Sequence, residues 1–313
     1  MLGYAIRRIA AAVPVAFCVA LLVFALLYLA PGDPAAVMAG DAASPADIEK
    51  LRIALGLDRP FLERFLHWLA GLAHGDLGTS VFTGLPVSML IGQRVLATAM
   101  LMLTAMLISG AIGIPAGTLA ACRPGGIADR AVLIGGVLGF SVPVFLIGYL
   151  LAYLFAYRLG WFAVQGFTSP FVDFVGFLRT IILPAATLAF AYAALIARIT
   201  RATMLEILAQ DHIRTARAKG LDEAYIVIVH GLSNAATPIL TIMGMGAAVL
   251  LGGAVVTETV FGIPGLGRLT VDAVLRRDYP VIQGVTLFLA FLFVAINLLI
   301  DLLCAAIDPR VRQ

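Results

Sequence analysis

Charged side chains are scarce in this chain of 313 residues: they make up 12% of it, whereas hydrophobic residues make up 62%. A soluble domain has about 25% charged residues. The apolar excess is spread over repeated long runs, so the composition excludes an ordinary soluble domain and predicts a protein that crosses a membrane several times. The net charge of +3 gives no indication of a nucleic-acid partner, and none is expected.

Cysteine is also rare. The three cysteines, Cys18, Cys122 and Cys304, lie far apart and form no CxxC pattern, which argues against a disulfide framework or a zinc site. The four histidines have no metal-binding spacing; His67 and His74, seven residues apart, are the nearest approach to one. We therefore predict no metal site.

Motifs for catalysis are missing. The sequence contains no G-x-x-x-x-G-K-[ST], which would cradle a nucleotide phosphate, and no H-E-x-x-H or G-x-S-x-G. We therefore expect no catalytic residues, no cofactor bound by this chain and no nucleotide hydrolysis by the chain itself.

What the sequence does have is long apolar runs. Each contains about the 20 residues that a helix needs to cross a bilayer, and helices are expected because lipid offers no partner for free backbone groups. The predicted fold is an all-α, polytopic bundle of about six transmembrane helices, roughly Ile9–Ala30, Val95–Ala121, Ala131–Tyr157, Thr180–Ala197, Ala236–Val256 and Val281–Ile307. The first run is longer than the apolar core of a signal peptide, so we interpret it as a retained span.

Lysine and arginine indicate the orientation. With the N-terminus in the cytoplasm, the inner segments carry 11 of the 21 Lys and Arg residues in little more than half the length of the outer ones. This distribution predicts that both termini are cytoplasmic. The chain then divides into a first segment and span (1–30), an extracytoplasmic loop (31–94), a core of five spans (95–307) that includes an inner loop (198–235), and a short tail (308–313).

The outer loop is expected to contain two short helices. Ser44 is a good N-cap residue, with Pro45 at the first helical position, and this helix should end near Leu55. The second, over Phe61–Leu72, is amphipathic, and its apolar face consists of Phe61, Phe65, Trp68 and Leu72.

Two acidic residues fall at or within the predicted spans. Glu258 lies at the outer end of the fifth, and Asp301 lies in the sixth. Because an acid on an apolar helix is costly, both are candidates for a gate or a transport pathway. A structural role is the alternative.

The inner stretch from Glu206 to Pro238 is polar, basic and helix-prone. Arg198, Arg201 and Glu206 follow the fourth apolar run and indicate that the fourth helix continues out of the membrane. Asp211 is expected to cap a new helix over His212–Lys219, and Gly220 is expected to end it.

Ile213 and Ala216 share a narrow face of this helix, and we interpret that face as a surface that enters a groove on another protein. Arg214 and Arg217, on its flank, would pair with a partner's carboxylates or with anionic lipid. The alternative is a solvated loop that is basic only because it lies inside.

Several stretches together resemble one family. The run Arg214-Thr215-Ala216-Arg217-Ala218-Lys219-Gly220-Leu221, followed by Asn234 and Pro238, is similar to the coupling loop of bacterial ABC importer permeases, in particular the dipeptide and oligopeptide branch. The resemblance covers nearly the whole chain, because further matching stretches occur in order at residues 30–34, 55–60, 75–80, 258–267 and 306–310. The broad family often has Glu where Arg214 stands, so an acidic contact to the ATPase is not expected here.

The resemblance implies a type I importer permease in the bacterial inner membrane. The chain would form half of the pathway for peptides or similar small solutes. Its partners would be membrane lipid, a second homologous permease, two ATPase subunits that bind ATP and Mg, and an extracytoplasmic solute-binding protein. The implied ATPase-coupling residues are Asp211, Ile213, Arg214, Thr215, Ala216, Arg217, Ala218, Lys219, Gly220 and Leu221. The outer loop would receive the binding protein, line the outer gate, or cap the bundle.

Two other functions remain open. A self-sufficient, ion-coupled transporter would need buried ionisable residues and often an inverted repeat, and neither is clear in this sequence. A membrane scaffold or receptor is the second. The importer hypothesis predicts that Ala216→Glu leaves membrane insertion intact and uncouples ATP hydrolysis from uptake.

Overall fold

The computed structural model describes residues 13–25, 35–36, 44–54 and 58–307. In these segments the chain is helical, apart from turns and one isolated bridge between Thr79 and Pro86. It divides into two compact units. The first contains residues 97–267 and 296–307, and the second contains the described residues up to 96 together with residues 268–295.

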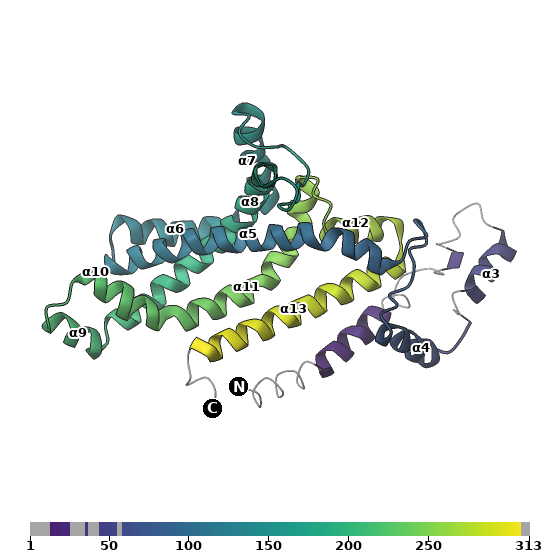
Figure 1. Cartoon of the computed structure of the whole chain (residues 1–313), viewed down its shortest axis with the longest axis horizontal. Helices are drawn as coiled ribbons and strands as arrows, with labels where there is room; N and C mark the ends of the chain where they lie inside the picture. Colours follow the sequence, from purple (N-terminus) through teal and green to yellow (C-terminus); the bar gives the residue numbers. More distant parts are fainter. Residues whose placement is uncertain (1–12, 26–34, 37–43, 55–57, 308–313) are drawn as a thin grey trace. The chain divides into compact units, whose positions relative to one another are not determined.

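Long apolar helices account for most of the predicted spans (Figure 1). Of the described residues, four helices are long and apolar enough to cross a membrane, or five if one bent pair is counted as a single span. The predicted second, fourth, fifth and sixth spans fall in α5 (Val87–Cys122), α8 (Phe174–Leu208), α11 (Ser233–Val260) and α13 (Tyr279–Ile307). Of the first, the structure describes the helix Val13–Ala25.

The third predicted span is a bent pair of helices and not one straight helix. It consists of α6 (Ile127–Ser141) and α7 (Val144–Leu151), which runs on into the π-helix η1 (Ala152–Arg158). The two halves are bent by 102°. Val142 between them is extended, with ψ of 124°, because the ring of Pro143 disfavours a helical conformation in the residue before it. The apolar run continues through the break, so hydropathy alone does not reveal it.

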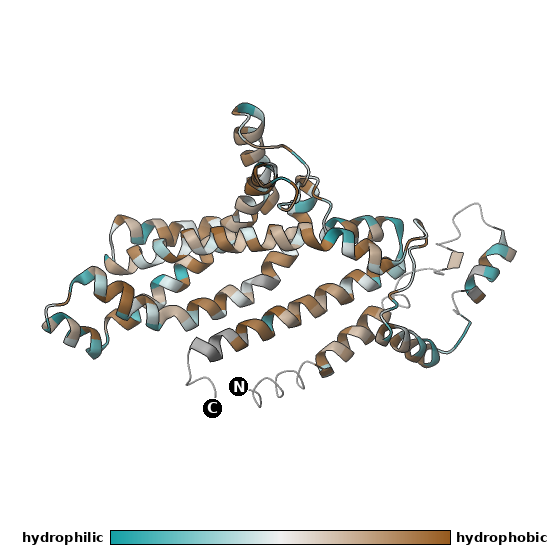
Figure 2. Cartoon of the chain, viewed as in Figure 1, coloured by the Kyte–Doolittle hydropathy of each residue, from teal (hydrophilic) through white to brown (hydrophobic). Residues whose placement is uncertain are grey.

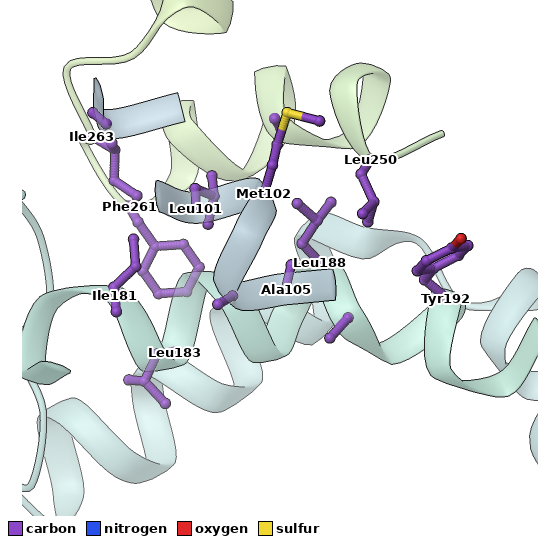
Figure 3. Close-up of a cluster of buried hydrophobic side chains, with 14 of the residues drawn as sticks. Leu101, Met102, Ala105, Ile181, Leu183, Leu188, Tyr192, Leu250, Phe261 and Ile263 are labelled. Carbon is purple, nitrogen blue, oxygen red and sulfur yellow. The ribbon is translucent and has the colours of Figure 1, made fainter. Parts of the chain in front are cut away.

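In the first unit, α8 is the central helix and packs against α6, α7 and α11. The core around it contains Leu101 from α5, Ile181 and Leu188 from α8, and Leu250 from α11 (Figure 3). Phe261, which follows α11, adds its ring to the same cluster. These side chains are nearly or fully buried, and their stabilisation comes from close packing against one another, because an apolar side chain in a membrane span gains little by leaving lipid.

Glycine allows α5 to lie directly on α8. A Cβ at Gly113 would lie 2.7 Å from the carbonyl oxygen of Ala193, and one at Gly117 would collide with the carbonyl of Ala197. Real Cβ atoms do not approach so closely, so these two positions require glycine. The spacing of four residues places both on one face of α5, as the small-xxx-small pattern indicates.

The second unit contains α3 (Pro45–Ala54) and α4 (Phe61–Ala73), close to the predicted bounds. Ser44 Oγ accepts a hydrogen bond from the backbone N–H of Asp47 at 3.3 Å, so the predicted cap is confirmed. The predicted apolar face of α4 is also confirmed: Phe65 is buried against Phe24, and Trp68 packs with the cluster that contains Leu287. Gly56, near the predicted end of α3, lies outside the described residues.

A buried hydrogen bond joins two distant parts of the second unit. Ser80 Oγ donates to Asp278 Oδ2 at 2.5 Å, across 198 residues of sequence. The backbone N–H of Val81 donates to the other carboxylate oxygen at 3.3 Å. This contact fixes the segment before α5 to the segment between α12 (Leu266–Arg276) and α13.

Candidate functional site

A short hydrophilic helix, α9 (Asp211–Ala218), follows the long helix α8 (Figures 1 and 2). The chain turns between them at Ala209 and Gln210, and Gln210 is extended, with ψ of 155°. The predicted cap is therefore displaced by one residue: Gln210 occupies the N-cap position, and Asp211 is the first residue of the helix. An acid in the first turn is favourable there because of the helix dipole.

The end of α9 confirms the predicted role of Gly220. Its φ is +76°, a conformation that favours glycine. The N–H of Gly220 donates to the carbonyl of Arg217 at 3.0 Å, and the N–H of Leu221 donates to the carbonyl of Ala216 at 3.3 Å. These two bonds form a Schellman motif, which satisfies carbonyls that the helix leaves free. Asp222 then caps α10 (Glu223–Tyr225) by accepting from the N–H of Ala224.

The apolar face of α9 is covered by the chain itself. Ile213 is 0% exposed and Ala216 is 7% exposed, and both pack with Ile226 of η2 (Ile226–Leu232) and with Leu208 at the end of α8. The interpretation of this face as the surface that enters a partner's groove is therefore wrong. Ile213 and Ala216 instead attach α9 to the two helices that flank it.

The remaining predicted coupling residues are exposed. Arg214 has 77% of its side chain in water, and it lies 3.5 Å from Asp211 on the same helix face. Neither partner of so exposed a pair is strongly held. The other exposed members of the predicted set are Thr215, Arg217, Ala218, Lys219, Gly220 and Leu221. Together with Asp211 and Arg214, these residues form a polar, predominantly basic surface. We call this surface the outer face of α9.

Arg217 has a partner within the chain. Its Nη2 donates to Glu223 Oε1 at 2.5 Å, and its Nε donates to Oε2 at 3.1 Å. These hydrogen bonds raise the pKa of Arg217 above its ordinary value. The forked pair links α9 to α10 across the Gly220 turn. Because Arg217 is already paired with Glu223, it is less available to a partner's carboxylate than the sequence indicated. Arg214 is more available to such a carboxylate than Arg217.

Glu258, one of the two predicted pathway acids, is 0% exposed. Its carboxylate accepts from Thr98 Oγ1 at 2.6 Å, and the same hydroxyl oxygen accepts from the N–H of Leu266 at 2.8 Å. A Cβ at Gly265 would overlap the carboxylate, so the chain after α11 closes tightly over Glu258. In this conformation Glu258 is a structural anchor for the start of α12, and the gate interpretation is not supported by its surroundings.

Asp301, the other predicted pathway acid, lies on α13. Its side chain lies outside the described part of the chain, so its role stays a prediction. Among the residues that the structure does describe, no group of three His, Cys, Asp or Glu side chains could hold a metal ion.

Sequence reasoning missed a second ionic contact near this site. Arg201 of α8 binds Asp129 of α6 through both Nε and Nη2, the latter at 2.9 Å from Oδ2. A pair separated by 72 residues has no local signature in the sequence. Asp129, an acid in the first turn of a mostly apolar helix, is a weak signal, because acids are favourable at that position of any helix.

Comparison with known proteins identifies the family. Residues 113–313 match the family described as "Binding-protein-dependent transport system inner membrane component", and residues 1–109 match "Binding-prot-dependent transport system membrane comp, N-term". The chain belongs to this family. It is therefore a multi-pass, inner-membrane permease subunit of an ABC transport system, and the family is one of transport components rather than enzymes.

Full-length relatives agree. The permease is 47% identical over 309 residues (99% of each chain) to the "Probable peptide ABC transporter permease protein y4tP" of Sinorhizobium fredii. It is 46% identical over 313 residues (100% of this chain, 99% of the relative) to a "Putative peptide transport system permease protein" of Brucella abortus. It is also 42% identical over 312 residues (100% and 99%) to the "Glutathione transport system permease protein GsiC" of Escherichia coli K12.

A solved structure supports the fold. The permease superimposes on a chain of the inward-facing MetNI methionine ABC transporter with a TM-score of 0.57. The match covers 70% of this chain and 96% of that chain at 20% sequence identity. At this identity the likeness shows the architecture alone, an ABC importer permease bundle, and says nothing about the solute.

Proposed function

We propose that this permease forms half of an importer pathway for peptides or related small solutes, such as glutathione. The second half would be a homologous permease, and two ATPase subunits would bind ATP and Mg and supply the energy. An extracytoplasmic binding protein would deliver the solute, with the loop 31–94 on its side of the membrane. Both termini would lie in the cytoplasm. The names of the full-length relatives support the solute class.

The observation that carries the coupling role is the construction of α9. It has only eight residues, too few to be stable alone, since isolated helices shorter than about 12–15 residues are marginal in water. Ile213 and Ala216 hold it against α8 and η2, while its outer face stays in solvent. A force applied by a partner to that outer face would therefore be passed to α8 and to η2, which runs directly into α11.

The outer face also indicates the chemistry of the partner surface. Arg214 and Lys219 are exposed cations, and Asp211 is the only acid in the eight residues of α9. We propose that the ATPase contributes an acidic or polar rim to this contact, because charge complementarity favours specific docking. Thr215 and Ala218 are small enough to let the helix backbone come close.

The test is purification of the tagged permease in mild detergent with mass spectrometry of the proteins that accompany it. We expect a second permease and two ATPase chains, and an assembly that hydrolyses ATP. If the permease is recovered alone while whole cells still show its transport, the coupling proposal is wrong and an ion gradient should be tested in its place.

A charge reversal then tests the outer face. Arg214→Glu should weaken ATPase association or transport, because the side chain is 77% exposed and would face the proposed acidic or polar rim. Arg276→Glu in α12 is the matched control, since Arg276 is also exposed and lies in another part of the chain. Full transport by Arg214→Glu would contradict the proposed contact. Ala216→Glu is a poorer test than the sequence suggested, because it would place a charge in the contact between α9 and its own chain.

A further inference from the structure

The buried ion pair between α6 and α8 is not explained by the docking of α9. Asp129 is 4% exposed, and Arg201 binds it in the forked geometry, with Nη2 at 2.9 Å from Oδ2 and Nε on Oδ1. The N–H of Gly125 also donates to Oδ2, at 2.8 Å. A buried carboxylate with three donors is held strongly, and such a bidentate contact fixes both distance and angle between the two helices.

The position of Arg201 relates this pair to α9. Arg201 and Leu208 are seven residues apart on the unbroken helix α8, about 10 Å along its axis. Leu208 packs against Ile213 and Ala216 of α9. Between them, Met204 is fully buried and joins α8 to a cluster that contains Val227 of η2. A continuous, packed path therefore leads from α9 along α8 to Asp129 of α6.

The contact of α8 with α5 contains a buried polar group without a partner, unlike the contact of α8 with α6, in which Asp129 and Arg201 are paired. Gly117 of α5 lies against the carbonyl of Ala197 and against Thr200. Thr200 Oγ1 is buried and, alone among the buried side-chain oxygens and nitrogens of the described residues, has no hydrogen-bond partner. A buried hydroxyl without a partner is costly, so this conformation leaves the α5–α8 contact incompletely satisfied.

We propose that Asp129 and Arg201 make α6 and α8 a single moving element, so that a displacement of α9 carries α6 with it while α5 stays behind. This inference rests on the proposed function, since it assigns the pair to the step between ATPase docking and the opening of the pathway. Asp129 and Arg201 are positioning residues: they touch neither solute nor nucleotide. The pair stays closed throughout the cycle, and the α5–α8 contact is the one that rearranges.

The first experiment measures coupling in the assembled transporter, reconstituted with its binding protein. The readout is solute moved per ATP hydrolysed. In Asp129→Asn and Arg201→Lys the forked contact is lost, and the ratio should fall at least about fivefold, the lower end of typical coupling between sites. A purely structural role would instead lower assembly and ATPase activity together and leave the ratio unchanged. Arg130→Gln, which changes the exposed neighbour of Asp129 on α6, is the control and should keep the wild-type ratio.

The second experiment restores the link by chemistry and does not depend on the stability of the single variants. In a chain whose three native cysteines are replaced by alanine, Asp129→Cys and Arg201→Cys are combined. Without reagent the transporter should be uncoupled, and a short bifunctional thiol reagent should restore transport, whereas a long flexible reagent should not. If the short cross-link blocks transport, the pair must open during the cycle and the proposal is wrong. Normal coupling without any link also overturns it.

The two proposals fail in distinguishable ways. If the wild-type chain forms no ATP-hydrolysing assembly, the proposed function is wrong. If the wild-type assembly couples uptake to hydrolysis and the variants keep the same ratio, only the inference about Asp129 and Arg201 is wrong.

Discussion

Ile213 offers a sharp test of how α9 is attached to the rest of the permease. The side chain is 0% exposed and lies against Ile226 and Leu208. Replacing a buried Ile with Ala costs about 2–5 kcal/mol, which is about 30-fold to several thousand-fold in an equilibrium, since about 1.4 kcal/mol is tenfold. Alanine has a higher helix propensity than isoleucine by at most about 0.7 kcal/mol, so the change in propensity would stabilise α9. It therefore cannot cause the expected loss of stability. We therefore expect Ile213→Ala to increase, by a factor in this range, the fraction of molecules in which α9 is detached from α8 and η2.

Hydrogen exchange followed by mass spectrometry measures this release directly. Peptides that span 209–222 should exchange at least about 30-fold faster in Ile213→Ala, and by a smaller factor in Ile213→Val, which costs about 0.5–1.5 kcal/mol. Arg214→Ala is the control: it changes an exposed side chain on the same helix and should leave the exchange unchanged. If Ile213→Ala exchanges as slowly as the wild type, the buried face does not hold α9, and the path from the outer face to the long helices fails with it.

Three further substitutions test other contacts, each by the midpoint of thermal unfolding of the detergent-solubilised permease. Gly113→Ala should lower stability by about 1–3 kcal/mol, because the new methyl group would lie 2.7 Å from a carbonyl of α8; Gly135→Ala, which meets no atom within 4 Å, should not. Thr98→Val keeps the shape but removes the hydroxyl that binds the buried carboxylate of α11, and about 1–3 kcal/mol should be lost, whereas Thr98→Ser should retain most of it. Ser80→Ala should cost a similar amount by removing a donor from buried Asp278. An unchanged midpoint in any of these would show that the contact does not stabilise the fold.

Local signals were sufficient for the elements with strong patterns. Ser44 before a proline predicted the start of α3, and the spacing of Phe61, Phe65 and Trp68 predicted the buried face of α4. The continuation of the fourth span beyond the apolar run followed from Arg201 and its charged neighbours, and α8 does extend to Leu208. In each case the cause is a helix-scale property, a cap or a period of 3.6, that the sequence carries within a few residues.

The break in the third span could not be predicted from the number of apolar residues alone. The apolar run continues through both halves, and the bend depends on the backbone of Val142 and the ring of Pro143. Prolines inside α5, α8 and α11 leave those helices unbroken. A proline in an apolar run therefore does not by itself decide between a mild kink and a bend of 102°.

The residues of the candidate site could be predicted from the sequence, but which face of α9 points toward the rest of the chain could not. The amphipathic spacing of Ile213 and Ala216 defined an apolar face correctly, yet periodicity does not say whether a partner or the chain itself covers it. The answer depends on Ile226, beyond the Gly220 turn. The same limit applies to Glu258, whose hydrogen-bond partner Thr98 is 160 residues away in the sequence. Contacts of this kind appear only when distant helices are placed together.

The two faces of α9 respond to different selective demands, and they can be changed independently. The inward side chains must fit helices of the same polypeptide, whereas Arg214, Thr215, Ala218 and Lys219 are exposed. On the proposed coupling role, a few surface substitutions would suit the permease to a different ATPase without rebuilding its membrane bundle. Transplanting the outward side chains alone, with Ile213 and Ala216 left in place, would then exchange motor subunits between related importers.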